Sequence, residues 1–525
     1  MLRVRQVKLE YNLDNNEELV EKIAKKLKIK VTDIVDYKIN KKSLDARRKD
    51  KLYYVYEVDV SIKNEDKVFI HNKSNDVVKT PREEYNFKVT GDKFLRFRPV
   101  IIGSGPAGLF TAYALAENGF HPLIIERGED MDTRVKTVNE FWQTGKLNLN
   151  SNVQFGEGGA GTFSDGKLNT LVKDKSFRMK KVFDTFVLNG APEEILYLNK
   201  PHIGTDILRD VVKNLRNKII KMGGEFRYNS KLEDIIIKND RVVGIKVNGE
   251  IIDCEVLVLA VGHSARDTFK MLYDKGLNME SKPFAVGVRI QHPQKMINKA
   301  QYGIADLTAS YKLTSNINGR GVYTFCMCPG GYVVNASSED DELAINGMSY
   351  HDRASDNANS AIVVSVSSKD YGEGVLAGME FQRSLEQKAY KWGKGRIPVQ
   401  LFKDFKEGTL SKEFGRVKPL FKGEYEMALV NEILPNDIYK CLKEAILYFD
   451  TKINGFGDDE VIIAGIESRT SSPVRIIRDD SCESNIKGIY PCGEGAGYAG
   501  GITTSAMDGL KVAEEIAKIY GGEYE

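Results

Sequence analysis

The stretch PVIIGSGPAGLFTAYALAENGFHPLIIE, residues 99–126, has the most regular pattern in this chain of 525 residues. Residues 99–103 form an apolar run that is typical of a short buried strand. Residues 109–118 have the composition of a helix, which Gly119 ends, and residues 121–126 form a second apolar run. This order of strand, turn, helix and strand predicts a βαβ unit with parallel strands.

The turn inside this unit, residues 103–108, reads GSGPAG and matches the pattern G-x-G-x-x-G. Gly103 permits a tight turn, Gly105 lets the backbone approach a pyrophosphate, and Gly108 lets the helix pack closely against the strand. Pro106 and Ala107 complete the turn. The free N–H groups and the dipole of the helix would face the phosphates, so the turn predicts dinucleotide binding.

An acidic residue ends the second strand of the unit. Glu126 lies 18 residues after Gly108, where its carboxylate can accept hydrogen bonds from both hydroxyls of a ribose. Arg127 follows it and is included in the predicted site. The acid would repel a 2′-phosphate, and it also argues against the alternative of a glycine-rich turn without a ligand.

A second motif near the other end of the chain indicates which dinucleotide is bound. Residues 488–494, GIYPCGE, read as a strand that ends in Gly493 and Glu494, and a helix is predicted over residues 503–519. This resembles the third FAD motif of the glutathione reductase-like flavoproteins, in which the acid holds the ribityl chain. The resemblance implies that Gly500, Gly501 and Ile502, at the start of the last helix, contact the flavin.

The middle of the chain carries the remaining motif of that group. Residues 254–262, CEVLVLAVG, resemble the strand that ends at a glycine, here Gly262. Upstream, Leu232 occupies the place where relatives contact adenine through backbone atoms. Residues 155–169, 467–475 and 492–501 resemble more closely a family of uncharacterised bacterial FAD-dependent dehydrogenases. That resemblance covers nearly the whole chain and implies FAD, a glutathione reductase-like fold and an oxidoreductase whose substrate it does not name.

Residues 156–166 are rich in glycine, which is unfavourable inside helices and strands. We interpret this segment as a loop that passes close to the isoalloxazine, while an exposed flexible loop is the alternative. Lys167 and Arg475 are our candidates for catalytic groups near the flavin or an anionic substrate. Each could equally be a surface or structural charge.

The fold class that these patterns predict is α/β, with a Rossmann-type FAD-binding domain interrupted by a mixed-sheet substrate domain. Residues 1–95 read as a small α+β domain, with strands over 7–11 and 52–62 and a helix over 19–27. Residues 96–280 are the first part of the FAD-binding domain, residues 281–460 the substrate domain, and residues 461–525 the C-terminal part of the FAD-binding domain.

Composition limits the partners. The 76 basic and 74 acidic residues nearly cancel, so we expect no general attraction to nucleic acid, and no apolar run is long enough to span a membrane. Six irregularly spaced cysteines favour a reducing cytoplasm. Basic residues between 41 and 51 are interpreted as a solvated turn. The competing hypothesis is an FAD-containing binding or sensing protein whose N-terminal module contacts a partner such as RNA.

Other chemistry finds little support in the sequence. We expect no metal site, because no Cys or His pair has zinc spacing, and no hydrolase, because no nucleophile elbow is present. Cys326 and Cys328 are not expected to form a redox pair, since cysteines separated by one residue rarely meet disulfide geometry. A second complete unit, with strand, G-x-G-x-x-G turn, helix, strand and terminal acid in order, is missing for NAD(P)H. If NAD(P)H reduces the protein, it must therefore dock transiently in the substrate cavity.

Overall fold

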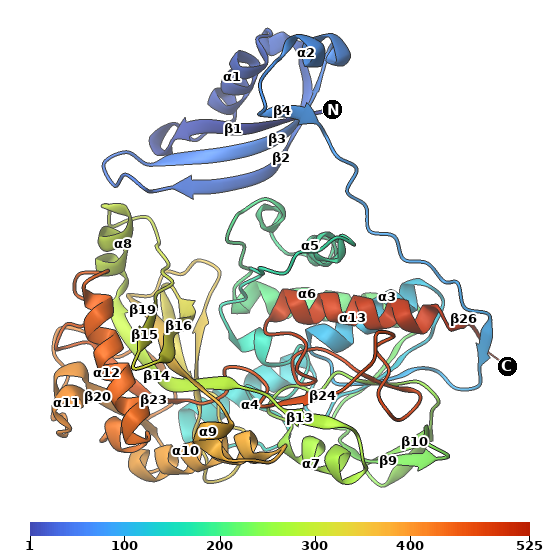
Figure 1. The fold of residues 1–525 in the computed structure, drawn as a ribbon, viewed down its shortest axis with the longest axis vertical. Coiled ribbons are helices and arrows are strands. Elements are labelled where there is room, and N and C mark those ends of the chain that lie inside the picture. The colour runs from blue at the N-terminus through green and yellow to red at the C-terminus, as the bar shows by residue number, and fades with distance from the viewer. Residues whose placement is uncertain (525) are drawn as a thin grey trace.

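The predicted βαβ unit lies at the centre of a five-stranded parallel sheet in the computed structural model of the protein, which describes residues 1–524 (Figure 1). The sheet order is β25-β12-β6-β7-β8. Its strands are short and, except for β8, fully buried, as their Val, Ile and Leu content favours. They are β6 (Val100–Ile102), β7 (Leu123–Ile125), β8 (Glu225–Arg227), β12 (Leu257–Leu259) and β25 (Ile489–Pro491).

Helices cover one face of this sheet, and a small sheet covers the other. The core on the helical face joins Ile101 and Val258 to four helices: α3 (Pro106–Glu117), α5 (Arg178–Leu188), α6 (Thr205–Lys221) and α13 (Ile502–Ala517). On the opposite face, a core cluster joins the sheet to helix α7 and to an antiparallel meander of three strands. These are α7 (Arg266–Asp274), β9 (Leu232–Lys238), β10 (Arg241–Val247) and β11 (Glu250–Asp253).

A seven-stranded mixed sheet is inserted between β12 and β25 in the sequence, with the order β15-β16-β19-β14-β23-β20-β22. The largest core cluster of the protein packs helices α10 and α12 against it. The elements are β14 (Phe284–Pro293), β15 (Thr314–Ile317), β16 (Arg320–Cys328), β19 (Asn357–Val366), α10 (Ala377–Gly393), β20 (Ile397–Leu401), β22 (Tyr425–Met427), α12 (Asn436–Asp450) and β23 (Ile462–Glu467). A parallel nucleotide-binding sheet interrupted by a mixed sheet is the fold class predicted from the sequence, which is confirmed.

Smaller elements complete these two regions. Strands β17 (Gly331–Asn335), β18 (Ile345–Ser349) and β21 (Phe421–Lys422) form a three-stranded sheet, and β13 (Met279–Ser281) pairs with β24 (Val474–Ile476). The remaining α-helices are α4 (Met131–Thr144), α8 (Gln294–Tyr302), α9 (Ser368–Tyr371) and α11 (Phe402–Glu407). No helix among residues 1–524 combines the length and apolar character that crossing a bilayer requires.

The N-terminal region folds as a four-stranded antiparallel sheet of order β2-β3-β1-β4, set apart from the rest of the molecule in Figure 1. Helix α1 buries Leu19, Ile23 and Leu27 against the sheet, at the spacing that predicted it. The elements are β1 (Leu2–Glu10), α1 (Asn16–Leu27), β2 (Ile34–Asp45), β3 (Tyr53–Ile62), α2 (Glu65–His71) and β4 (Val77–Lys79).

Two details of this region differ from expectation. Lys41 and Lys42 lie on strand β2 rather than in a turn, because β2 pairs along its whole length with β3. The edge of β2 also binds the larger body: the N–H of Lys42 donates to the carbonyl of Tyr197 at 2.7 Å, and that of Asn199 to Lys42 at 2.9 Å. The segment 63–95 holds helix α2 and two strands: β4 pairs with β1, and β5 (Lys93–Leu95) pairs with β26 (Tyr520–Tyr524).

Candidate active site

A cavity of about 400 Å³ lies between the parallel sheet and the seven-stranded sheet. The residues that follow the carboxyl ends of β6, β7, β12 and β25 line one side, which is where open parallel sheets bind ligands. The glycine-rich segment after Phe155 and residues of β16, β18 and β23 line the other side. The cavity therefore brings together segments that are far apart in the sequence.

The turn between β6 and α3 has the geometry that its glycines predict. Gly103 has φ of +100°, which favours glycine. A Cβ on Gly108 would lie 1.9 Å from the carbonyl oxygen of Gly103, so only glycine permits this helix–strand approach. A Cβ on Gly105 would have its nearest neighbour at 3.8 Å, and Gly105 caps the N-terminus of α3. Gly103, Gly105, Pro106 and Ala107 line the cavity, whereas Gly108 packs behind them.

The carboxylate of Glu126 is held rigidly at the end of β7, where it lines the cavity and is 5% exposed. Its Oε2 accepts hydrogen bonds from the N–H and the hydroxyl of Ser104 at 2.9 and 2.8 Å. Its Oε1 accepts from the N–H groups of Gly128 and Gly156 at 2.9 and 3.1 Å. The three N–H donors are fixed in the backbone, whereas the Ser104 hydroxyl can rotate away from Glu126. A ribose hydroxyl could therefore replace the Ser104 hydroxyl as a donor to Oε2.

The residues of the other predicted FAD contacts divide into two groups. Leu232 at the start of β9, together with Gly262, Gly500, Gly501 and Ile502, lines the cavity. Gly493 does not: its N–H donates to Asp508 at 2.8 Å, and a Cβ there would lie 2.6 Å from that of Ala107. Gly493 thus lies against helix α3, at the base of the site.

Two side chains face each other where β12 and β25 end. Glu494 lines the cavity, and its Oε1 lies 3.3 Å from Nδ1 of His263. The Nε2 atom of His263 is buried without a hydrogen-bond partner. Arg127 is also a lining residue; it binds Asp267 through two nitrogens at 3.1 Å and lies over the ring of Phe155, while its buried Nε has no partner.

The two candidate catalytic residues lie in different places. Lys167 lines the cavity, and its buried Nζ makes no hydrogen bond, although Asp165 Oδ2 lies 3.6 Å away. Arg475, on strand β24, is half-buried and is not among the lining residues. It lies near the ring of Tyr498 and 3.5 Å from Glu280 of the neighbouring strand β13. The structure therefore brings Lys167, but not Arg475, to the cavity.

Asp165 is a buried charge beside Lys167. Its carboxylate is 1% exposed and accepts hydrogen bonds from Nε and Nη2 of Arg353 at 3.0 and 2.5 Å. Burial raises the pKa of Asp165, but the positive charges of Lys167 and Arg353 outweigh that effect and hold the pKa below its usual value. Asp165 therefore remains ionised and gives the Lys167 ammonium a fixed counter-charge.

Several lining residues are not among the sequence-based candidates because only the fold brings them together. Phe325 and Cys326 come from the mixed sheet and Asn346 from strand β18 of the three-stranded sheet. Arg469 and Thr470 come from the segment that follows β23. Arg469 and Thr470 belong to the motif 467–475, which signalled a resemblance without indicating a position. Phe325 and Asn346 carry no sequence signal of this kind.

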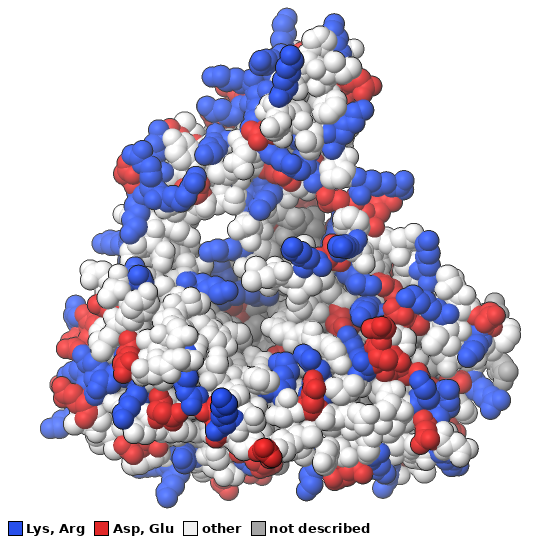
Figure 2. All heavy atoms as spheres, in the orientation of Figure 1, with Lys and Arg blue, Asp and Glu red and all other residues white. Residues whose placement is uncertain are grey.

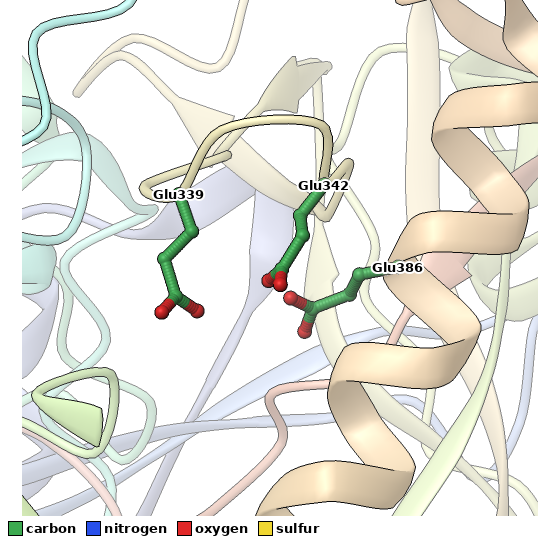
Figure 3. Close-up of side chains that lie close together, drawn as sticks. All are labelled: Glu339, Glu342 and Glu386. Atoms are coloured by element: carbon green, nitrogen blue, oxygen red, sulfur yellow. The ribbon is translucent and has the colours of Figure 1, made fainter. Parts of the chain in front are cut away.

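Arg469 is held by a buried cluster of charges next to the cavity. Glu339, Glu342 and Glu386, drawn in Figure 3, have carboxylate oxygens within 4.8 Å of one another, and the side chains of Glu342 and Glu386 point toward each other. Glu386, on helix α10, accepts hydrogen bonds from Nε and Nη2 of Arg469 at 2.9 and 2.6 Å, and from Arg266 at 2.8 Å.

The cluster is balanced by arginines. Arg266 also contacts Glu339 and Glu342 at 2.5 and 2.8 Å, and Arg383 contacts Glu342 at 3.1 Å. Burial, and then the charge of Glu386, raise the pKa of Glu342 to about 8. Since Arg266 starts helix α7 and Glu386 belongs to the mixed-sheet region, the cluster connects the two walls of the cavity and fixes Arg469.

The basic residues of the N-terminal region are largely paired with acids. Lys42 binds Asp14 at 2.6 Å, Arg47 lies 2.6 Å from Asp45, Arg48 2.7 Å from Asp50, and Lys51 2.9 Å from Glu10. Figure 2 nevertheless shows many Lys and Arg side chains on this part of the surface and around the hollow below it. The pairing reduces the net positive charge that an RNA backbone would meet.

The lining residues fit FAD. Gly105, Gly262, Gly500 and Gly501 leave open space where a side chain would intrude, since a Cβ on the last three would meet nothing within 4 Å. The N-termini of α3 and α13 both reach the cavity, and such termini favour phosphates and other negative charge. The unpartnered nitrogens of Arg127, Lys167 and His263 are the polar atoms that a ligand would satisfy.

Three family models match the chain. Residues 283–470 match the C-terminal domain-like model of FAD-dependent proteins. Residues 101–156 match the NAD(P)-binding Rossmann-like domain, and residues 1–61 match a domain of unknown function. The first model covers the mixed-sheet region, and the second covers the turn at Gly103 and the acid at Glu126.

Known proteins resemble the chain to different degrees. An uncharacterized protein of Clostridium beijerinckii is 48% identical over 526 residues, covering 98% of each chain. The protein FixC of Escherichia coli K12 is 24% identical over 241 residues, which are 43% of this chain and 52% of FixC.

The solved structures to which the chain is similar are distant. The FAD complex of CtdE is 12% identical with a TM-score of 0.33, over 80% of this chain and 84% of CtdE. L-proline dehydrogenase from P. horikoshii is 14% identical with a TM-score of 0.34, over 81% and 94%. Because the Clostridium relative is nearly half identical along its whole length, and the mixed-sheet region matches the FAD-dependent model, the chain belongs with that relative to a family of FAD-dependent proteins.

Proposed function

We propose that the protein is a flavin oxidoreductase that passes a hydride between FAD and a small organic substrate bound in the cavity. The observation that carries this proposal is the position of Lys167. Its buried, unpartnered Nζ reaches a cavity that one wall of nucleotide-binding turns and one wall of mixed sheet enclose. The proposal includes membership of the glutathione reductase-like subgroup. It also includes a location in the cytoplasm, which the sparse cysteines predict.

Each cavity wall has its own role. The turn at Gly105 would hold the pyrophosphate, Glu126 the adenosine ribose, Glu494 the ribityl chain, and the N-terminus of α13 the flavin pyrimidine. When bound, FAD supplies the hydride acceptor or donor. Residues 281–460 would form the substrate domain, inserted between the two parts of an FAD-binding domain, 96–280 and 461–525.

Lys167 would bind the substrate through charge. Its ammonium keeps one fixed counter-ion, Asp165, at 3.6 Å, but has no hydrogen-bond acceptor of its own. A substrate carboxylate would provide that acceptor and would be oriented by it, and a charge-assisted contact of this kind contributes about 1.5–3 kcal/mol. The buried cluster behind Arg469 keeps the facing wall rigid.

The electron donor would use the same cavity. The pattern G-x-G-x-x-G occurs at residues 103–108, 156–161 and 495–500, but only the first is the turn of a complete βαβ unit that ends in an acid, and this turn is assigned to FAD. A nicotinamide cofactor therefore has no second domain of that type and would enter transiently, before or after the substrate.

Anaerobic stopped-flow spectroscopy tests the proposal. The FAD-loaded protein is mixed with NADH, with NADPH and with a library of small carboxylic acids, and the flavin absorbance is followed. At least one compound should bleach the flavin band with saturable kinetics. Slow, non-saturating bleaching by every compound would contradict an oxidoreductase.

A pair of variants tests the role of Lys167. Lys167→Met keeps the length of the side chain and removes its charge, so it should raise the KM for an anionic substrate about tenfold or more while FAD stays bound. Lys173→Met removes an exposed lysine from the same segment and serves as the control. Equal KM values in the two variants would remove Lys167 from the substrate site.

A further inference from the structure

Two thiols lie together at the edge of the cavity, at the end of strand β16. Cys326 lines the cavity, and Cys328 is completely buried. In a regular strand, residues two apart are separated by about 6.6 Å, which leaves their Cβ atoms too far apart for a disulfide. Here the Sγ of Cys328 donates a hydrogen bond to the carbonyl oxygen of Cys326 at 3.3 Å, and the two thiols are close enough to affect each other's ionisation.

A β-bulge brings the thiols together. Phe325 pairs with Ala361 and Cys328 with Asn359, so β16 contains one residue more than β19 across this interval. Cys326 lies in this bulge and has φ of +42°, a conformation that residues other than glycine rarely adopt. A bulge of this kind bends the strand locally and re-aims its side chains.

Arg289 holds the bulge in place. Its fully buried guanidinium donates to the carbonyl of Cys326 at 3.1 Å and to the side chain of Asn359 at 2.8 Å. A bidentate pair with Glu467, at 2.8 and 2.9 Å, fixes the arginine. The strained backbone is therefore stabilised by a dedicated buried contact, as is common at functional sites.

The charges around the pair favour a thiolate at the cavity. The adjacent Cys328 thiol lowers the pKa of Cys326 to about 5, and the positive charges of Lys167 and Arg289 help to overcome burial and the opposing charge of Asp165. The pKa of Cys328 is raised. Cys326 thus lines the cavity in surroundings that favour its thiolate, and the Cys328 thiol lies against its backbone, an arrangement suited to reversible disulfide chemistry.

We propose that Cys326 and Cys328 are a reversible dithiol–disulfide pair that exchanges two electrons with the flavin. As the S–S bond forms, the two thiols lose two electrons and two protons, which reduce FAD to its dihydro form; the reverse reaction cleaves the disulfide and oxidises the flavin. The inference rests on the proposed function, because it requires FAD in this cavity. It gives the protein two two-electron centres instead of one.

The test is an anaerobic reductive titration of the FAD-loaded protein after oxidation with diamide and removal of the oxidant. Wild type should take up four electrons from dithionite per FAD, whereas Cys326→Ala and Cys328→Ala should each take up two. Cys441→Ala, which removes a buried cysteine of helix α12, is the control and should still take up four. FAD content is measured for each protein, and the partly exposed Cys326 is the safer of the two substitutions for folding.

Alkylation of the same samples gives a readout that does not depend on the flavin. The peptide that contains Cys326 and Cys328 should resist iodoacetamide after diamide and accept two labels after reduction. Two labels after diamide, together with an uptake of two electrons by wild type, would overturn the inference. If the flavin in that sample is still bound and reducible, the proposed function stands; failure to bind FAD would overturn the proposed function itself.

Discussion

Replacing Gly105 with valine should remove FAD binding while sparing the fold. Gly105 has φ of −73° and ψ of −178°, which valine adopts without strain, and a Cβ would meet no atom closer than 3.8 Å. The change costs some helix capping and gains about 0.4–1 kcal/mol by restricting the unfolded chain. The free energy of unfolding of the apo-protein should therefore change by less than about 1 kcal/mol.

The effect on the cofactor should be much larger. The added side chain would fill the space through which the pyrophosphate reaches the N-terminus of α3. Losing two charge-assisted hydrogen bonds costs about 3–6 kcal/mol, or roughly a hundred- to ten-thousandfold in Kd. Titration of FAD into the apo-proteins, followed by flavin fluorescence, measures this difference.

Gly108→Ala provides the contrasting control. Its Cβ would lie 1.9 Å from the carbonyl oxygen of Gly103, so this variant should lose stability in the apo-protein by about 1–3 kcal/mol or more. Denaturant unfolding of the two apo-variants separates the effects. Wild-type FAD affinity in Gly105→Val, or an apo-protein as unstable as Gly108→Ala, would refute the assigned role of the turn.

Three other predictions concern the cofactor and the response to pH. Heating the protein should release FAD rather than FMN, because FMN has no ribose for Glu126 to bind; chromatography of the supernatant identifies the flavin. Glu494→Ala should weaken FAD binding about ten- to a hundredfold and Glu494→Asp less, and unchanged affinity in the alanine variant would mean that the ribityl contact is misplaced. His292 is fully buried and binds the carbonyl of Phe456 at 2.8 Å, and burial lowers its pKa to about 4. Below about pH 6.5 the imidazole of His292 binds a proton in the unfolded state but not in the folded state. The contribution of His292 to the free energy of unfolding is therefore fully present above about pH 6.5 and is lost as the pH falls toward 4. His292→Gln should flatten this decline in acid unfolding curves; an unchanged slope would contradict the assignment.

The parallel sheet could be predicted because its signals are local. The apolar runs around residues 99–126 and the glycines between them specify a strand, a turn and a helix without reference to the rest of the chain. The predicted ligand-binding glycines and Glu126 reach one cavity because the carboxyl ends of parallel strands share an edge. Gly493 and Arg475 are adjacent to such motifs in sequence, yet packing turns them away from the cavity.

The other features depend on distant contacts. Strand β2 alternates apolar and polar residues only over 35–40. Its basic second half is a strand because β3 pairs with it on one side while the larger body binds its edge. The contact of the Cys328 thiol with the Cys326 carbonyl lies in a bulge that Arg289 stabilises from another strand. No local pattern reports either interaction, since both are determined by tertiary structure.

The insertion of the mixed sheet has a consequence for biosynthesis. Strand β25 and helix α13 belong to the nucleotide-binding region, but they follow the whole seven-stranded sheet in the chain. On the ribosome, residues 100–259 therefore emerge with one edge of the parallel sheet unpaired and with α3 lacking its neighbour α13. All strands of the mixed sheet lie within residues 284–467. This sheet can therefore assemble while the edge of the parallel sheet is still unpaired. The cofactor site is thus complete only after the mixed sheet has been synthesised, because β25 and α13 both follow it.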